Sequence, residues 1–130
     1  MSLVMNKFYY TEEHEWLKVE EGNIAVVGIT DHAQDSLGDI VFLEMPKEGE
    51  DFTQGDEIGV IESVKTVSNL YIPVSGSIIE VNSDVVEDPA FVNSSPYDEG
   101  WLVRIEMTEP SELEDLLSAD DYTELISKEE

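Results

Sequence analysis

A single lysine stands between two runs of strand-forming residues near the middle of the chain, and this pattern constrains the fold more than any other. Residues 58–61 precede Lys65 and residues 67–72 follow it. Both runs are rich in aliphatic and aromatic side chains, which favour extended strands. Gly55 lies ten residues before the lysine and Gly76 lies eleven residues after it. The near-mirror spacing predicts a β-hairpin with Lys65 at its tip and a glycine turn at each far end.

A lysine at a hairpin tip presents a primary amine on a flexible stem. An enzyme that attaches a cofactor can enclose such a tip without unfolding the rest of the domain. In an arbitrary hairpin the simpler interpretation is a solubilising turn residue. This chain, however, has only six basic residues against 31 acidic ones. A lysine at this position therefore requires a specific explanation.

Further short β-forming segments, separated by glycine and proline turns, are typical of a β-sandwich or flattened barrel. They are expected at residues 8–10, 15–20, 24–29, 39–44, 77–82 and 101–106. Thr30 or Asp31 can cap a brief helix that Gly38 ends, and residues 89–93 can form one helical turn. The expected fold is mostly β, with short helices added at its edges or faces.

The end of the chain has helical rather than strand character. Ser111 and Glu114 have the spacing of a capping box, and Ser118 or Asp120 can begin a second helix that runs to Lys128. We expect one domain over residues 1–130, with C-terminal helices over about 111–128. Residues 1–7 are interpreted as a leader, with Met5 as an alternative start. This leader is too short for a signal peptide and lacks its basic region, and it also lacks the Arg-rich, Ser-rich composition of a mitochondrial leader.

Composition excludes several classes of function. The chain contains no cysteine, so structural disulfides, thiolate catalysis and zinc–thiolate sites are ruled out. Its net charge of −25 would repel nucleic acid and anionic membranes, and no apolar run reaches the length of a membrane span. The charge favours partners with basic docking patches, although solubility alone is an equal explanation for it.

No catalytic or metal-binding motif is visible. His14 and His32 are the only histidines, and neither belongs to a helical pair of metal ligands. Metal binding would require the two rings to meet in space with carboxylates, so structural or capping roles are expected instead. The chain has no Gly-rich phosphate loop, and Ser63, Ser68 and Ser75 have no histidine nearby in sequence that would indicate a nucleophile. We therefore expect neither a metal site nor a catalytic residue.

The sequence resembles the glycine cleavage H-protein family over nearly its whole length after residue 8. Lys65 and its neighbours look like the family's lipoyl attachment motif. Further matching blocks occur in the family's order at residues 10–17, 27–39, 71–76, 92–97 and 100–102. This extended match is much more specific than a modified-lysine motif alone.

The resemblance implies a lipoyl-type barrel-sandwich hybrid with lipoate joined to Lys65 by an amide. It implies a carrier that catalyses nothing itself. In the scheme that the resemblance implies, glycine decarboxylase loads an aminomethyl group, aminomethyltransferase passes the carbon to tetrahydrofolate, and dihydrolipoyl dehydrogenase reoxidises the dithiol. A lipoate-attaching enzyme is a further implied partner, and relay of lipoyl groups to other enzymes is a related role. We expect a monomer in the cytoplasm, or in the mitochondrial matrix if a transit peptide has been removed.

The resemblance also implies a surface cleft that shelters the loaded arm from water. Glu15 occupies the position where family members place a carboxylate near the loaded amine. Ser36 stands where the family often has histidine, and Asn69 stands where it often has an acid. Serine and asparagine keep hydrogen-bonding capacity but carry no charge. We therefore expect the arm to be held by neutral hydrogen bonds together with Glu15.

Three alternatives remain open from the sequence. A biotin carrier uses a similar hairpin, but biotin acceptors usually flank the lysine with methionines, whereas Val64 and Thr66 stand here. Lipoyl domains of 2-oxo acid dehydrogenases usually have an acidic residue just before the lysine and belong to longer chains. The last alternative is an acidic interaction module whose lysine stays unmodified.

Overall fold

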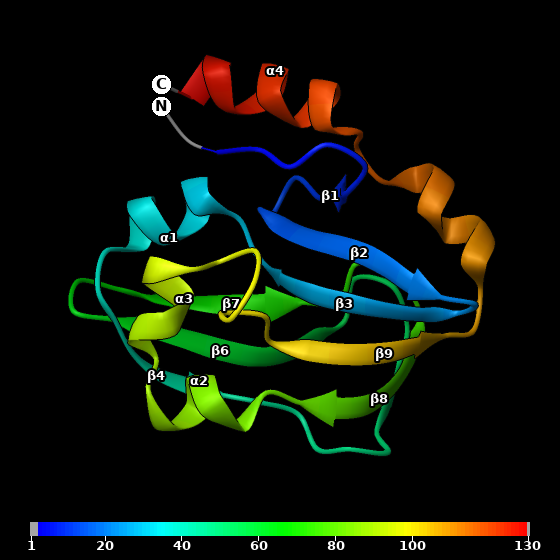
Figure 1. Cartoon of the computed structure of the whole chain (residues 1–130), viewed down its shortest axis with the longest axis horizontal. Helices are drawn as coiled ribbons and strands as arrows, with labels where there is room; N and C mark the ends of the chain where they lie inside the picture. The colour runs from blue at the N-terminus through cyan, green and yellow to red at the C-terminus, as the bar shows by residue number, and fades with distance from the viewer. Residues whose placement is uncertain (1–2, 130) are drawn as a thin grey trace.

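The computed structural model describes residues 3–129, and within this range two antiparallel sheets pack into a flattened sandwich rather than a closed barrel (Figure 1). The larger sheet has the strand order β1-β2-β3-β9-β8-β5, and the smaller one has the order β4-β6-β7. The strands are β1 (Tyr9–Tyr10), β2 (Glu15–Glu21), β3 (Ile24–Ile29), β4 (Ile40–Glu44), β5 (Asp51–Phe52), β6 (Glu57–Ser63), β7 (Val67–Tyr71), β8 (Gly76–Val81) and β9 (Val103–Met107). This arrangement confirms the predicted fold class.

Helical segments lie at both ends of the sandwich, and the last helix runs along the outer side of the larger sheet (Figure 1). They are α1 (Asp31–Leu37), α2 (Ser83–Glu87), α3 (Ala90–Ser94), the 3₁₀ helix η1 (Pro110–Asp115) and α4 (Ala119–Glu129). None of the helices within residues 3–129 is both long and apolar enough to cross a bilayer.

The central hairpin is confirmed by the register of the smaller sheet. Strands β6 and β7 pair antiparallel, from Glu57 opposite Tyr71 to Glu62 opposite Val67, and Lys65 lies in the connection between them. At the other end of the hairpin, Gly55 adopts a φ of +87°, in the left-handed region that glycine favours. The expected turn at that end is therefore present.

Alternation along β2 divides its side chains between two apolar clusters. Leu17 belongs to the main core, which draws residues from both sheets and from α2 and α3. Its neighbour Trp16 points to the opposite face, as successive residues of a strand do, and joins a second cluster beneath α4. In that cluster the rings of Tyr10 and Tyr122 stack with centroids 4.6 Å apart. This stacking fixes α4 against the larger sheet.

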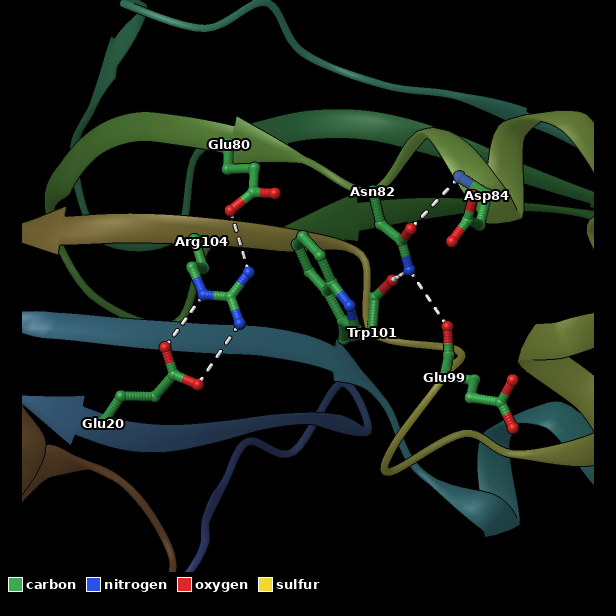
Figure 2. Close-up of polar contacts among 7 residues, drawn as sticks. All are labelled: Glu20, Glu80, Asn82, Asp84, Glu99, Trp101 and Arg104. Atoms are coloured by element: carbon green, nitrogen blue, oxygen red, sulfur yellow. Dashed lines mark hydrogen bonds and ion pairs between the residues drawn. The ribbon is translucent and has the colours of Figure 1, made fainter.

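Polar contacts tie the strands of the larger sheet together on its outer surface (Figure 2). Arg104 of β9 donates to Glu20 of β2 and to Glu80 of β8, and its guanidinium lies 4.5 Å from the ring of Trp101. The side chain of the buried Asn82 accepts a hydrogen bond from the backbone N–H of Asp84 and donates to the backbone carbonyls of Glu99 and Trp101. These contacts connect β8, α2 and the start of β9.

Two details of the predicted hairpin and last strand are wrong. Gly76 does not form a turn: it begins β8 and pairs with both Phe52 and Met107. Glycine is needed there because a Cβ would lie 2.5 Å from the carbonyl oxygen of Glu106. The last strand begins at Val103 rather than Trp101. The backbone carbonyl of Trp101 accepts a hydrogen bond from the side chain of Asn82 instead of one from a neighbouring strand.

The helical predictions are partly wrong as well. Ser111 and Glu114 form no capping box, since the segment is a 3₁₀ helix without a side-chain cap, and its proline stands at the first position. Helix α2 was not predicted at all; Asn82, expected at the end of a strand, is its N-cap. By contrast Thr30 caps α1, and the side chain of Ser118 accepts a hydrogen bond in the first turn of α4, both as expected.

Candidate functional site

The hairpin tip is organised by the side chain of Ser63, the last residue of β6. Its Oγ accepts hydrogen bonds from the backbone N–H groups of Lys65 (3.3 Å) and Thr66 (3.1 Å). The backbone N–H of Ser63 donates to the carbonyl of Thr66 at 2.8 Å. The backbone N–H groups of the turn are therefore hydrogen-bonded within the turn itself. The exposed side chain of Lys65 takes no part in these hydrogen bonds.

The stem of Lys65 lies against the loop that follows α1. A Cβ built on Gly38 would stand 3.0 Å from Cε of Lys65, and Gly38 has a φ of +81°. The backbone N–H of Val64 donates to the carbonyl of Asp39 at 3.0 Å. The end of α1 and the hairpin tip are thus joined, with the lysine stem between them.

A cleft of about 220 Å³ opens beside the same hairpin. It lies between α1, the hairpin strands β6 and β7, and the loop that leads into β2. Its walls combine apolar and polar side chains from these elements, and they comprise Glu13, His14, Glu15, Ile29, His32, Ala33, Ser36, Leu37, Ile61, Ser68, Asn69 and Glu129. The cleft wall ends at Leu37, directly before the glycine on which the Lys65 stem lies.

Glu15 is the one strongly buried acid in this cleft, with 2 % of its surface exposed. Its carboxylate accepts a hydrogen bond from the hydroxyl of Thr11 at 2.7 Å and a long one from the backbone N–H of Tyr71 at 3.3 Å. Burial raises the pKa of Glu15 to about 7, and the hydrogen bonds from Thr11 and Tyr71 only partly oppose this shift. At neutral pH the group is poised between its acid and its anion.

The structure places all three residues expected in the cleft among those that line it. Ser36 is exposed on the last turn of α1, and Asn69 is exposed on β7, where its amide donates to the hydroxyl of Tyr71 at 3.3 Å. Together with Glu15 they offer a carboxyl, a hydroxyl and an amide to a bound chain. Neither Ser36 nor Asn69 adds a charge.

The two histidines meet at the rim of the cleft. The rings of His14 and His32 have centroids 4.9 Å apart, and Nε2 of each lies 3.4 Å from the same carboxylate oxygen of Glu129. Burial lowers the pKa of His14, although the Glu129 carboxylate opposes this. No local sequence pattern indicates this convergence, because Glu129 reaches the rim only through the docking of α4.

Exposed apolar side chains surround the tip. Phe42 of β4 and Val67 of β7 both lie opposite Glu62 of β6, so they flank it on one face of the smaller sheet. Their exposed fractions are 54 % and 60 %, and that of Val64, beside the lysine, is 68 %. We call Phe42, Val64 and Val67 the tip patch.

Comparison with known proteins agrees with this geometry. The glycine cleavage H-protein family matches the chain over residues 8–129. A glycine cleavage system H protein of Staphylococcus epidermidis is 53 % identical over 125 residues, which cover 96 % of this chain and 98 % of the relative. A protein of the same name from Carboxydothermus hydrogenoformans is 51 % identical over 129 residues, which cover 99 % of this chain and 98 % of the relative.

A solved structure is similar as well. The crystal structure of a glycine cleavage system H protein from Mycobacterium marinum superposes with a TM-score of 0.86 at 38 % sequence identity. The alignment covers 95 % of this chain and 99 % of that one. The likeness therefore extends over nearly the whole chain.

Proposed function

This chain belongs to the glycine cleavage H-protein family, and on that basis we propose that it carries lipoate in amide linkage on Lys65. Proteins of this family are the carrier component of glycine cleavage, so the chain carries the aminomethyl group between enzymes and catalyses no step itself. The observation that carries the proposal is the placement of Lys65, which is exposed at the hairpin tip with its stem resting on Gly38.

The residues around the tip fit a covalently attached group. Ser63 holds the turn without using the lysine side chain, so an attaching enzyme can enclose the amine without disturbing either sheet. When bound, lipoate supplies the disulfide–dithiol chemistry that this cysteine-free chain lacks. Tethering raises the local concentration of the carried group at each enzyme to which the protein docks.

We further propose that the cleft receives the arm between encounters. Lys65 lies four residues beyond Ile61 of the cleft wall, and because β6 ends at Ser63 the two are at most about 13 Å apart, the length of four extended residues. Ser36 and Asn69 offer neutral hydrogen bonds there, and Glu15 offers its carboxylate. A cationic amine that enters beside Glu15 would favour the anion of this group and would be screened from water by the cleft walls.

The expected partners follow from family membership. We propose that glycine decarboxylase, aminomethyltransferase, dihydrolipoyl dehydrogenase and a lipoate-attaching enzyme each dock around the tip of a monomeric carrier. The tip patch is the apolar surface available for them, since clustered exposed apolar side chains commonly mark interaction sites. The relatives named above are bacterial, which supports a cytoplasmic location.

Mass spectrometry of the intact protein tests the attachment. We expect protein produced with a lipoylating system to gain one lipoyl-sized increment, to lose it in Lys65→Arg, and to keep it in the control Lys47→Arg. Lys47 is likewise exposed, but it lies in the loop after β4. A biotin-sized increment, no increment, or an increment that survives Lys65→Arg would contradict the proposal.

The role of Glu15 is tested by the lifetime of the loaded arm. Glu15→Gln keeps the shape of the side chain but removes the anion, so we expect faster hydrolysis of the aminomethyl-loaded form. Glu12→Gln, which changes an exposed acid outside the cleft, is the matched control. An unchanged rate in Glu15→Gln would show that this carboxylate does not hold the cargo.

A further inference from the structure

Three side chains from distant parts of the sequence converge on one point at the rim of the cleft. His14 comes from the loop before β2, His32 from α1, and Glu129 from the last turn of α4. Their potential ligand atoms all lie within 4.8 Å of one another. Nε2 of each histidine is 3.4 Å from Oε1 of Glu129. Two imidazoles and one carboxylate therefore face a common space.

The two nitrogen–oxygen distances match those of a tetrahedral metal site. Ligand atoms that lie about 2.0–2.1 Å from a zinc ion in tetrahedral geometry are separated from one another by about 3.3 Å. Both nitrogen–oxygen separations in this cluster are 3.4 Å. The set supplies three ligands, as catalytic and exchangeable zinc sites do, and leaves the fourth position to water.

The surroundings of His14 suit a metal ligand. Its other ring nitrogen, Nδ1, lies 2.8 Å from the hydroxyl of Tyr122, which lies 2.6 Å from Oγ1 of Thr30. If Nδ1 donates to Tyr122 and Tyr122 donates to Thr30, the lone pair of Nε2 is left facing Glu129. Thr30 can still accept from Ala33 as the cap of α1. Such outer hydrogen bonds fix the tautomer and orientation of histidines that bind metals.

We propose that His14, His32 and Glu129 bind one divalent transition-metal cation of the Zn²⁺ class. Imidazole and carboxylate ligands favour such cations over Mg²⁺ and Ca²⁺, which prefer oxygen alone. The bound ion joins the last turn of α4 to α1 and to the loop before β2. It also places a positive charge at the rim of the cleft in a strongly acidic protein. The site is independent of the modification of Lys65.

Titration with Zn²⁺ tests the proposal directly. The full-length protein, free of any histidine tag and with its lipoyl group oxidised, is titrated in excess Mg²⁺, which occupies non-specific carboxylate sites. We expect one saturable Zn²⁺ per chain. Imidazole ¹⁵N spectra should show that Nε2 of both histidines shifts on binding while Nδ1 of His14 keeps its proton. The absence of a saturable single site, or unchanged histidine signals, would overturn the proposal.

Matched variants on α4 distinguish the site from general acidity. We expect His32→Gln and Glu129→Gln each to weaken Zn²⁺ binding by about tenfold or more, since even outer-sphere partners are typically worth that much. Glu124→Gln removes the same charge from an exposed position on the same helix and should leave the affinity unchanged. Equal weakening by Glu124→Gln and Glu129→Gln would refute a defined site.

Discussion

At the scale of single residues, Glu15 has the most consequential environment. It is almost fully buried, and the hydrogen bonds that its carboxylate accepts from Thr11 and Tyr71 compensate only in part for the loss of hydration. Burial raises the pKa of Glu15 from 4.5 to about 7. The folded state therefore binds more protons than the unfolded state between these values, so the contribution of Glu15 to stability is greatest below pH 4.5. It falls as the pH rises and reaches its minimum above pH 7.

This sign leads to a prediction for Glu15→Gln. Removing the buried anion should increase the free energy of unfolding at pH 8 by about 1–3 kcal/mol. The gain should vanish near pH 4, where the native side chain is already protonated. Urea unfolding at several pH values measures both effects, and Glu12→Gln corrects for the loss of one negative charge. A gain that does not depend on pH would contradict this description of Glu15.

Sequence could identify some site residues but not others. Lys65 lies within a local pattern, and Glu15, Ser36 and Asn69 follow from a family resemblance that aligns them. The meeting of His14 and His32 with Glu129 has no such local signal. It depends on α4 folding back over the larger sheet, which is fixed by the stacking of Tyr10 on Tyr122. Contacts of this kind, between elements that are distant in the sequence, produce no periodic pattern of residues from which they could be predicted.

Among the secondary-structure elements, the predictions were correct for strands whose alternating or continuous apolar side chains are buried in the core. The hairpin strands and β3 are examples. Errors occurred where one side chain substitutes for strand pairing. Asn82 follows the last residue of β8 and caps α2, and its side-chain amide donates to the backbone carbonyls of Glu99 and Trp101 (Figure 2). Because these carbonyls do not pair with a neighbouring strand, β9 begins later than expected. Neither the helix nor the delayed strand could be predicted without knowing that these segments are adjacent.

Asn82 should therefore be important for stability. We expect Asn82→Ala to lower the free energy of unfolding by about 2–4 kcal/mol, because it removes a helix cap and leaves two carbonyls without their donor. Asn82→Asp should be at least as damaging despite keeping the cap, since a carboxylate would face both carbonyls. Chemical denaturation measures these losses. A loss below about 0.5 kcal/mol in Asn82→Ala would mean that the cluster is not structural.

At the scale of the whole molecule, a net charge of −25 dominates the surface. Self-repulsion of this size destabilises the compact state, and salt screens it over a Debye length of about 10 Å at 0.1 M. We expect the melting temperature to rise as NaCl is increased from low to moderate concentration. Differential scanning calorimetry measures the shift, and KCl should reproduce it. A melting temperature that stays constant or falls would indicate that the charges are already compensated.

The tip patch provides a prediction about docking. Phe42→Ser removes an exposed apolar side chain that buries little in the isolated protein, so folding stability should change by less than about 0.5 kcal/mol. Lipoylation or transfer rates with the partner enzymes should fall several-fold if the patch contacts them. Val86→Ser, at an exposed apolar position on α2, is the control. Equal rates for wild type and Phe42→Ser would exclude Phe42 from docking.

We propose above all that Lys65, once lipoylated, carries the one-carbon cargo between enzymes. The most direct measurement is glycine-dependent formation of methylene-tetrahydrofolate with glycine decarboxylase, aminomethyltransferase and dihydrolipoyl dehydrogenase supplied. We expect turnover when the lipoylated chain is added, and none with Lys65→Arg carried through the same lipoylation. Turnover that persists in Lys65→Arg, or its absence with the fully lipoylated protein, would refute the carrier role of Lys65.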